Sequence, residues 1–206
     1  MSLTFYYSPM STAEITALVL EELGVPHKRV LMDLKQGDTK KPKFLKVNPN
    51  GAVPTIVHDD TAIWESTAIT MYLGETFGVD KKLYPAPGPK RGQAMMWITW
   101  GNVTLGEAVG RLMRHTTDWY PKDQQNPNAA EAAKADLMAR LKILDGALAG
   151  KSFLLGDYTL VDTHLNSLVD WLRMSHIDLS AFANVNAWSK RCAERPAYIK
   201  WRAQGK

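Results

Sequence analysis

The chain has 206 residues, of which 45% are hydrophobic and 22% are charged, and its formal net charge is +4 at neutral pH. This composition is that of an ordinary globular protein. No apolar run is long enough to cross a membrane, and the first residues lack the basic and apolar regions of a secretory signal. The single cysteine, Cys192, excludes an intrachain disulfide and is expected to be a small buried apolar residue. We therefore expect a cytoplasmic protein.

The basic residues and the possible metal ligands exclude further classes. One tight basic cluster lies within residues 40–46, but no basic stripe is interleaved with aromatic residues, so nucleic-acid binding is not expected. The sequence shows no histidine or cysteine spacing typical of a metal site and no glycine-rich phosphate loop. We therefore expect no metal.

The first third of the chain alternates strands and helices. Residues 3–7 are aromatic and β-branched, which predicts a strand, and residues 12–23 carry apolar side chains at helical spacing before a terminating Gly24. Further elements are predicted as a strand at 27–31, a short helix or turn at 42–47, strands at 54–57 and 62–64, and an amphipathic helix at 66–77. The strand–helix–strand start predicts a parallel strand pair.

The chain changes character after residue 78. Proline and glycine are dense in residues 79–89, which is typical of a linker between domains. The rest is predicted to be helical, at about 90–115, 129–149, 160–173 and 180–194, with a short last helix from Pro196. Two domains are therefore expected, at 1–78 and 90–206. Thr159 and Asp162 form a capping box for the helix at 160–173, whose loss would cost about 1 kcal/mol.

Four short motifs stand out, and two of them suggest a ligand site. In chain order they are Ser8-Pro9-Met10-Ser11-Thr12, Asn48-Pro49-Asn50-Gly51-Ala52-Val53-Pro54, Glu65-Ser66-Thr67 and Gly156-Asp157-Tyr158-Thr159-Leu160-Val161-Asp162. A cis bond before Pro54 would leave the N–H and C=O of Val53 free to pair with an extended ligand. Ser66 and the helix N-terminus that follows it suit an anion, and Glu65 suits an ammonium group. An extended ligand with a free amine and carboxylates would fit.

On these four motifs the chain resembles the cytosolic glutathione transferases over essentially its whole length, in particular their serine-type bacterial and plant members. The resemblance implies an α/β thioredoxin-like N-terminal domain followed by an all-α C-terminal domain. It also implies a detoxifying transferase that conjugates the thiolate of glutathione, its co-substrate, to small hydrophobic electrophiles. Enzymes of this family pair as homodimers, so a homodimer is expected here.

The resemblance places the catalytic hydroxyl at Ser11, just after the first strand. A free thiol has a pKa of about 8.5, and one hydrogen bond to the thiolate, worth about 1.5–3 kcal/mol, would lower that pKa by roughly one to two units. Ser11 and Glu14 also have the spacing of a capping box, which offers Ser11 a structural role. Thr12, Tyr6 and Tyr7 are the alternative hydroxyl donors.

The binding residues follow from the resemblance one by one. Val53, with Pro54 in cis, is expected to pair with the cysteinyl backbone of glutathione. Glu65 is expected to bind the γ-glutamyl amine, and Ser66 the γ-glutamyl carboxylate.

Two parts of the expected site match the family less closely. Thr39 and Ala52 stand where relatives carry ligands of the glycyl carboxylate, which leaves Lys40 as the best candidate for that role. The electrophile is expected between the two domains, with Met10 and Met113 in the wall of its pocket.

Two other functions remain open at this point. The same thiolate could serve a glutathione-dependent peroxidase or isomerase, and the chain could be a non-catalytic binding or regulatory protein with this fold. The homodimer has circumstantial support, because Met71, Tyr72, Trp97 and Trp100 are large side chains that two small cores do not obviously need.

Overall fold

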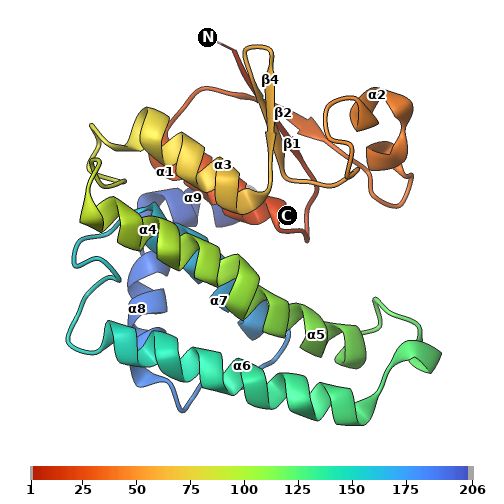
Figure 1. Ribbon diagram of the computed structural model, residues 1–206, viewed down its shortest axis with the longest axis vertical. Coiled ribbons are helices and arrows are strands. Elements are labelled where there is room, and N and C mark those ends of the chain that lie inside the picture. Colours follow the sequence, from red (N-terminus) through yellow and green to blue (C-terminus); the bar gives the residue numbers. More distant parts are fainter. Residues whose placement is uncertain (1, 204–206) are drawn as a thin grey trace.

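The computed structural model describes residues 2–203, and its N-terminal part is a four-stranded sheet with helices on both faces (Figure 1). The elements are β1 (Leu3–Tyr7), α1 (Ala13–Leu23), β2 (Lys28–Leu31), η1 (Asp38–Lys40), α2 (Pro42–Leu45), β3 (Thr55–His58), β4 (Thr61–Trp64), α3 (Ser66–Leu73) and the π-helical turn η2 (Gly74–Gly78). The strand order is β2-β1-β3-β4, with β1 parallel to β2 and antiparallel to β3. The predicted thioredoxin-like domain is confirmed.

Alternation along β1 decides which helix each side chain meets. Leu3 and Phe5 are buried in one apolar cluster with residues of α1 and α3. Tyr6 points to the opposite face, where its ring lies 5.4 Å from that of Phe44 in α2. The sheet is thus covered on one face by α1 and α3, the layer that also meets the second domain (Figure 1).

The rest of the chain is helical. It contains α4 (Pro89–Trp100), the π-helical segment η3 (Gly101–Gly106), α5 (Glu107–Thr116), η4 (Lys122–Gln124), α6 (Pro127–Leu148), α7 (Leu160–Met174), α8 (Ala183–Ala193) and α9 (Pro196–Ala203). Helices α4 and α5, joined by η3, form one long rod that lies along α6 (Figure 1). Helix α7 passes behind this rod and α6. The all-helical second domain is confirmed. Within residues 2–203, no helix combines the length and the apolar character that crossing a bilayer requires.

The single helix predicted at 90–115 is divided by η3. At its start, Gly101 packs so closely on α7 that a Cβ there would lie 3.4 Å from the side chains of Leu165 and Leu168. A π-helical segment inserts one extra residue per turn and so changes the direction in which the following side chains project. The sequence pattern did not predict this segment, because its apolar spacing continues through it.

Helix α7 is buried from Leu160 to Asp170 although it carries several polar side chains. The predicted capping box is confirmed: Asp162 accepts from the N–H of Thr159 at 3.0 Å, and also from the indole N–H of Trp188 in α8 at 2.9 Å. Burial raises the pKa of Asp162, whereas its hydrogen bonds act in the opposite direction.

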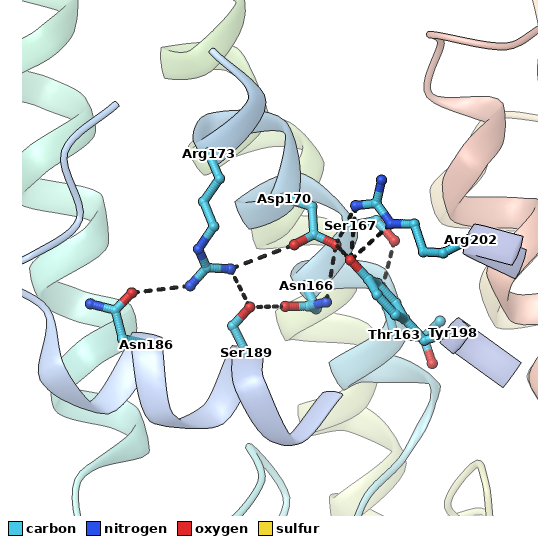
Figure 2. A network of polar contacts seen from close by, with 9 residues as sticks. All are labelled: Thr163, Asn166, Ser167, Asp170, Arg173, Asn186, Ser189, Tyr198 and Arg202. Carbon is cyan, nitrogen blue, oxygen red and sulfur yellow. Dashed lines mark hydrogen bonds and ion pairs between the residues drawn. The ribbon is translucent and has the colours of Figure 1, made fainter. Parts of the chain in front are cut away.

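Further along α7, a polar network holds α8 and α9 in place (Figure 2). Asn166 accepts from Ser189 of α8 at 2.5 Å, and Asp170 accepts from the hydroxyl of Tyr198 in α9 at 2.7 Å. Arg173 donates to Ser189 and pairs with Asp170. Burial, followed by the nearby Asp170 carboxylate, raises the pKa of Tyr198 to about 12, so this hydroxyl remains a donor.

The apolar residues that suggested an unfilled interface have partners within the chain. Met71, Trp97 and Trp100 pack against the core of the helical domain, and the two indole rings meet edge to face at 5.2 Å. Tyr72 packs on the N-terminal core, and its hydroxyl lies 2.5 Å from Nδ1 of His58. That argument for a dimer was therefore wrong.

The two domains are joined by a buried ion pair as well as by apolar packing. Arg195, just before α9, donates two 2.7 Å hydrogen bonds to Glu22 of α1, whose side chain is only 5% exposed. The Tyr158 hydroxyl donates to the same carboxylate at 2.9 Å.

We expect Arg195→Met to lower the free energy of unfolding by about 3 kcal/mol, because it leaves the Glu22 carboxylate buried without its cation. Urea unfolding measures this. Lys200→Met is the matched control: Lys200 pairs with Glu21 but is 66% exposed, so its loss should cost less than about 1 kcal/mol. Equal losses in the two variants would contradict the assigned role of burial.

Candidate functional site

The turn after β1 brings two hydroxyl side chains to the start of α1. The Ser11 hydroxyl donates to the carbonyl of Ser8 at 2.6 Å and accepts from the N–H of Ala13 at 3.2 Å. Ser11 therefore satisfies the first N–H of α1 with its side chain. It does not form the predicted capping box with Glu14, because the N-cap residue of α1 is Thr12 and not Ser11. The proton of the Ser11 hydroxyl is used within the turn.

Thr12 lies against the loop that precedes β3. Its Oγ1 is 3.5 Å from the carbonyl oxygen of Val53, a long and weak contact, and the Val53–Pro54 bond is cis. Lys40 reaches the same loop and donates to the carbonyls of Asn50 and Gly51 at 3.2 and 2.9 Å. This arrangement places the Thr12 hydroxyl, the Val53 backbone and the Lys40 ammonium along one loop.

Gly51 makes the close approach of Lys40 possible. Its φ is +58°, and a Cβ at this position would lie 2.7 Å from the carbonyl oxygen of Thr39 and 2.9 Å from Nζ of Lys40. Only glycine adopts this conformation without strain and leaves the required space.

Glu65 and Ser66 open α3 in very different environments. Glu65 is exposed and has a φ of +70°, a conformation that is costly for a residue with a Cβ and that tends to occur at functional sites. Ser66 is 4% exposed at the first position of α3, where the unpaired N–H groups of the helix favour an anion.

A partly buried chain of hydrogen bonds connects Ser66 to the second domain. Nδ2 of Asn102, in η3, donates to Oγ of Ser66 at 2.7 Å, and Oδ1 of Asn102 lies 2.8 Å from Nε2 of His164 in α7. Nδ1 of His164 lies 2.9 Å from the hydroxyl of Thr70 in α3. These three hydrogen bonds, called the relay below, join Ser66 of α3 to Asn102 of η3, to His164 of α7 and back to Thr70, one turn further along α3.

The direction of every hydrogen bond in this relay is fixed. Burial lowers the pKa of His164 to about 3, so its ring is neutral and carries one N–H. Because Oδ1 of Asn102 can only accept, that N–H is on Nε2, and the Thr70 hydroxyl donates to Nδ1. Ser66 receives a hydrogen bond from Asn102, so its own proton is available to donate to an anion.

Two hollows meet at Asn102. One is an open depression of about 1020 Å³ between α3 and α4, lined by Glu65, Met71 and Met96 among others. The other is a smaller, mostly apolar cavity of about 230 Å³ between the domains. Thr12, Ile15, Met113, Leu168 and Trp171 are among the residues that line this interdomain cavity. Asn102 lines both hollows, so it lies at the boundary between the open depression and the interdomain cavity.

The other residues that the sequence predicted for the site are not all brought together by the fold. Met113 lines the interdomain cavity, whereas Met10 is 48% exposed on the turn, at φ +53°, and is not among the residues that line the cavity. Tyr6 and Tyr7 line two other surface pockets. Cys192 is buried as expected, and burial raises the pKa of its thiol.

The sequence did not predict Asn102, His164 or Thr70 as site residues. Each lies within a helix and belongs to no local motif, and Asn102 is 62 residues from His164 along the chain. The sequence offered one signal for these residues: they are polar side chains among the apolar positions of predicted helices. That pattern does not predict which residues they contact.

Comparisons with known proteins agree with this geometry. The glutathione S-transferase N-terminal domain model matches residues 1–75, and the glutathione S-transferase C-terminal domain model matches residues 110–196. The chain belongs to the glutathione S-transferase family. Family membership thus supports a glutathione transferase kind of activity.

Solved structures of family members have the same fold. The glutathione transferase URE2P6 from Phanerochaete chrysosporium, in complex with oxidized glutathione, is 27% identical with a TM-score of 0.91, over 98% of this chain and 96% of that one. URE2P8 from the same organism, with oxidized glutathione, is 25% identical with a TM-score of 0.89, over 98% and 95%. A delta-class glutathione transferase from Nilaparvata lugens is 29% identical with a TM-score of 0.87, over 98% and 94%.

We expect His164 to make folding dependent on pH. The unfolded chain protonates this residue near pH 6.5, whereas the folded chain keeps it neutral down to about pH 3. Its stabilising contribution is therefore fully present above about pH 6.5 and is lost as the pH falls, by about 2 kcal/mol between about pH 7 and pH 5.

Urea unfolding of the wild type and of His164→Gln at these two pH values measures this effect. The variant should lose less stability on acidification, by about that amount, because it has no proton to gain. The same loss in both proteins would show that the folded chain protonates His164.

Proposed function

We propose that this chain is an active glutathione transferase that conjugates glutathione to small hydrophobic electrophiles and so serves in detoxification. The single observation that carries the proposal is the position of Asn102. It contacts Ser66, an anion-binding residue by its place at a helix N-terminus, and it also lines the apolar cavity beside Thr12. A polar peptide and an apolar electrophile would thus meet at one point.

The proposed binding set is Glu65 for the γ-glutamyl amine, Ser66 for its carboxylate, and Val53 with Pro54 for the cysteinyl backbone. The Asn102 relay supports the role of Ser66, because it leaves the serine proton free for a carboxylate. Lys40 is proposed for the glycyl carboxylate, since its ammonium group lies beside the Gly51 turn.

The bound thiol needs a hydroxyl donor, and the Ser11–Thr12 turn offers two. The family resemblance gives Ser11 the position of the catalytic serine, but Ser11 must rotate away from the Ser8 carbonyl, which forfeits a hydrogen bond worth about 1 kcal/mol. Thr12 makes only the 3.5 Å contact to Val53 and lines the cavity, so its proton is freer. We retain Ser11 as the proposed catalytic residue and Thr12 as its direct rival.

We expect Ser11→Ala to lower the turnover of an aryl halide at least about tenfold, because a one-unit rise in thiol pKa cuts the thiolate fraction about tenfold. Thr12→Val is the matched variant. The thiolate absorbance of each enzyme–glutathione complex, titrated against pH, identifies the donor. A shift to higher pH in Thr12→Val alone would transfer the role to Thr12, and no shift in either variant would refute a hydroxyl mechanism in this turn.

Glu65→Gln and Ser66→Ala should each weaken glutathione binding by about 1–3 kcal/mol, the usual cost of losing a charge-assisted hydrogen bond. Isothermal titration calorimetry measures the affinity. Wild-type affinity in both variants would remove these residues from the site. If glutathione binds normally but no electrophile reacts, the non-catalytic binding protein becomes the better description, and turnover of a peroxide alone would favour the peroxidase.

A homodimer is also proposed, on different grounds from those of the sequence. Trp64, Met95, Met96 and Val103 are exposed, and the two methionines line the open depression beside Glu65 together with Val103. Exposed apolar residues gathered on one face are typical of an interface. Light scattering at micromolar concentration should give about twice the chain mass of 23.0 kDa. An active monomer would refute the dimer without affecting the proposed site.

A further inference from the structure

Strand β2 forms one edge of the sheet, and its outer side pairs with no other strand of the described chain. The N–H of Met32, just after β2, donates to the carbonyl of Tyr7 in β1 at 2.8 Å. Because backbone groups alternate along a strand, Val30 also directs its N–H and C=O toward β1, whereas Arg29 and Leu31 direct theirs outward. These outward groups are able to pair with one more strand.

The two faces of β2 open onto separate pockets. Lys28, Val30 and Met32 line a pocket of about 310 Å³ that reaches α2 and is called the α2 pocket below. Arg29 and Leu31 line a pocket of about 210 Å³ that reaches α9 and is called the α9 pocket. Successive side chains of a strand point to opposite faces, which explains this division. An extended peptide paired with β2 would place alternate side chains beside the two pockets, the arrangement by which added strands are recognised.

The α2 pocket suits an aromatic side chain with acidic neighbours. Its apolar wall includes Phe44 of α2. Lys28 and Lys43 also line it, both are exposed, and neither forms an ion pair within residues 2–203. The carboxylate in this pocket, Asp38, is already paired with Lys41 at 2.6 Å. Two lysines are therefore left to attract carboxylates from outside the chain.

The α9 pocket suits an apolar side chain. The Arg29 guanidinium lies over the rings of Tyr7 and Trp201, 4.5 and 4.9 Å from their centroids, so its cation is already engaged. Leu31 lines the same pocket and is 58% exposed. A β-branched side chain opposite Leu31 would cover this apolar surface.

We propose that β2 is the docking edge for an extended acidic segment of a partner protein. The segment pairs with the backbone of Arg29 and Leu31, places an aromatic side chain at the α2 pocket, and has acidic residues two positions before and after it, beside Lys28 and Lys43. Pairing of β2 with its own copy would put Lys28 and Arg29 of both copies in one short ladder, where like charges are unfavourable. None of the residues proposed to bind glutathione lines either pocket, so this inference goes beyond the proposed function.

A blocked heptapeptide, Thr-Glu-Val-Phe-Val-Glu-Thr, tests the docking edge. Its sequence is the same in both directions, so it presents the same side chains to either strand polarity. Titrated into isotope-labelled protein, it should shift the amide resonances of residues 28–32 and slow hydrogen exchange at Arg29 and Leu31. A control peptide with N-methyl groups on its phenylalanine and both valines keeps the side chains but loses the backbone donors. Equal binding of the two peptides, or no shift in β2 at millimolar peptide, would overturn the proposal.

Leu31→Pro removes one outward N–H and no hydrogen bond to β1, because proline is tolerated where a strand edge faces solvent. Leu31→Ala is the matched control, since it removes the side chain and keeps the N–H. The proline variant should bind the peptide at least about threefold more weakly than the alanine variant, the effect of one lost hydrogen bond. Equal affinities would overturn strand pairing. If light scattering shows that Leu31→Pro alone converts a dimer to a monomer, β2 pairs with a second copy and the proposal is also wrong.

A charge swap tests the partner's chemistry independently of that variant. Lys28→Glu combined with Lys43→Glu should weaken binding of the acidic peptide roughly tenfold, and a peptide with lysine in place of both glutamates should restore it. Lys142→Glu combined with Lys151→Glu changes the net charge equally at exposed positions of the second domain and should bind like the wild type. The same loss in both double variants, or no rescue by the lysine peptide, would overturn the assigned role of Lys28 and Lys43.

Discussion

The burial of α7 is the constraint on which the rest of this structure depends. From Leu160 to Asp170 every residue is buried, although the segment includes acidic, amide, hydroxyl and imidazole side chains. Each such group would cost several kcal/mol if it were left without a partner. The partners come from every direction: Asp162 binds the indole of Trp188, His164 binds Thr70 of the first domain, and Asp170 binds Tyr198 of α9. The position of α7 therefore fixes the positions of its neighbours.

One of these partnerships reaches the candidate site at Ser66. His164 needs an acceptor for its Nε2–H, and Asn102, which lies in the π-helical segment η3, supplies one at 2.8 Å. Once the imidazole has fixed the carbonyl end of Asn102, the amide end must point at Ser66. A requirement of the buried core thus sets the orientation of a hydroxyl at the domain boundary. The site is held by the same hydrogen bonds that hold the domains together.

The sequence predicted the features that depend on local chemistry. The strands, most helices and the Thr159–Asp162 box all follow from neighbours in the chain, and the structure confirms them. The cis bond before Pro54 was implied by the family resemblance, and it is present. The sequence could not predict contacts between distant polar residues such as Asn102 and His164, because helical spacing alone does not say which elements become neighbours. It also misjudged Met71 and Tyr72, since their partners belong to the other domain and to β3.

The two halves of the site differ in how much change they can tolerate. The half that contains Gly51, Ser66 and Asn102 rests on backbone conformation and on hydrogen bonds between elements, so a substitution there disturbs the fold. The apolar half is bounded by a methionine and by Gly110, whose added Cβ would touch nothing. Changes in that half alter volume without breaking any hydrogen bond of α7. Substitutions on the α5 side can therefore change the volume of the interdomain cavity, while α7 keeps the two domains in place through its buried hydrogen bonds.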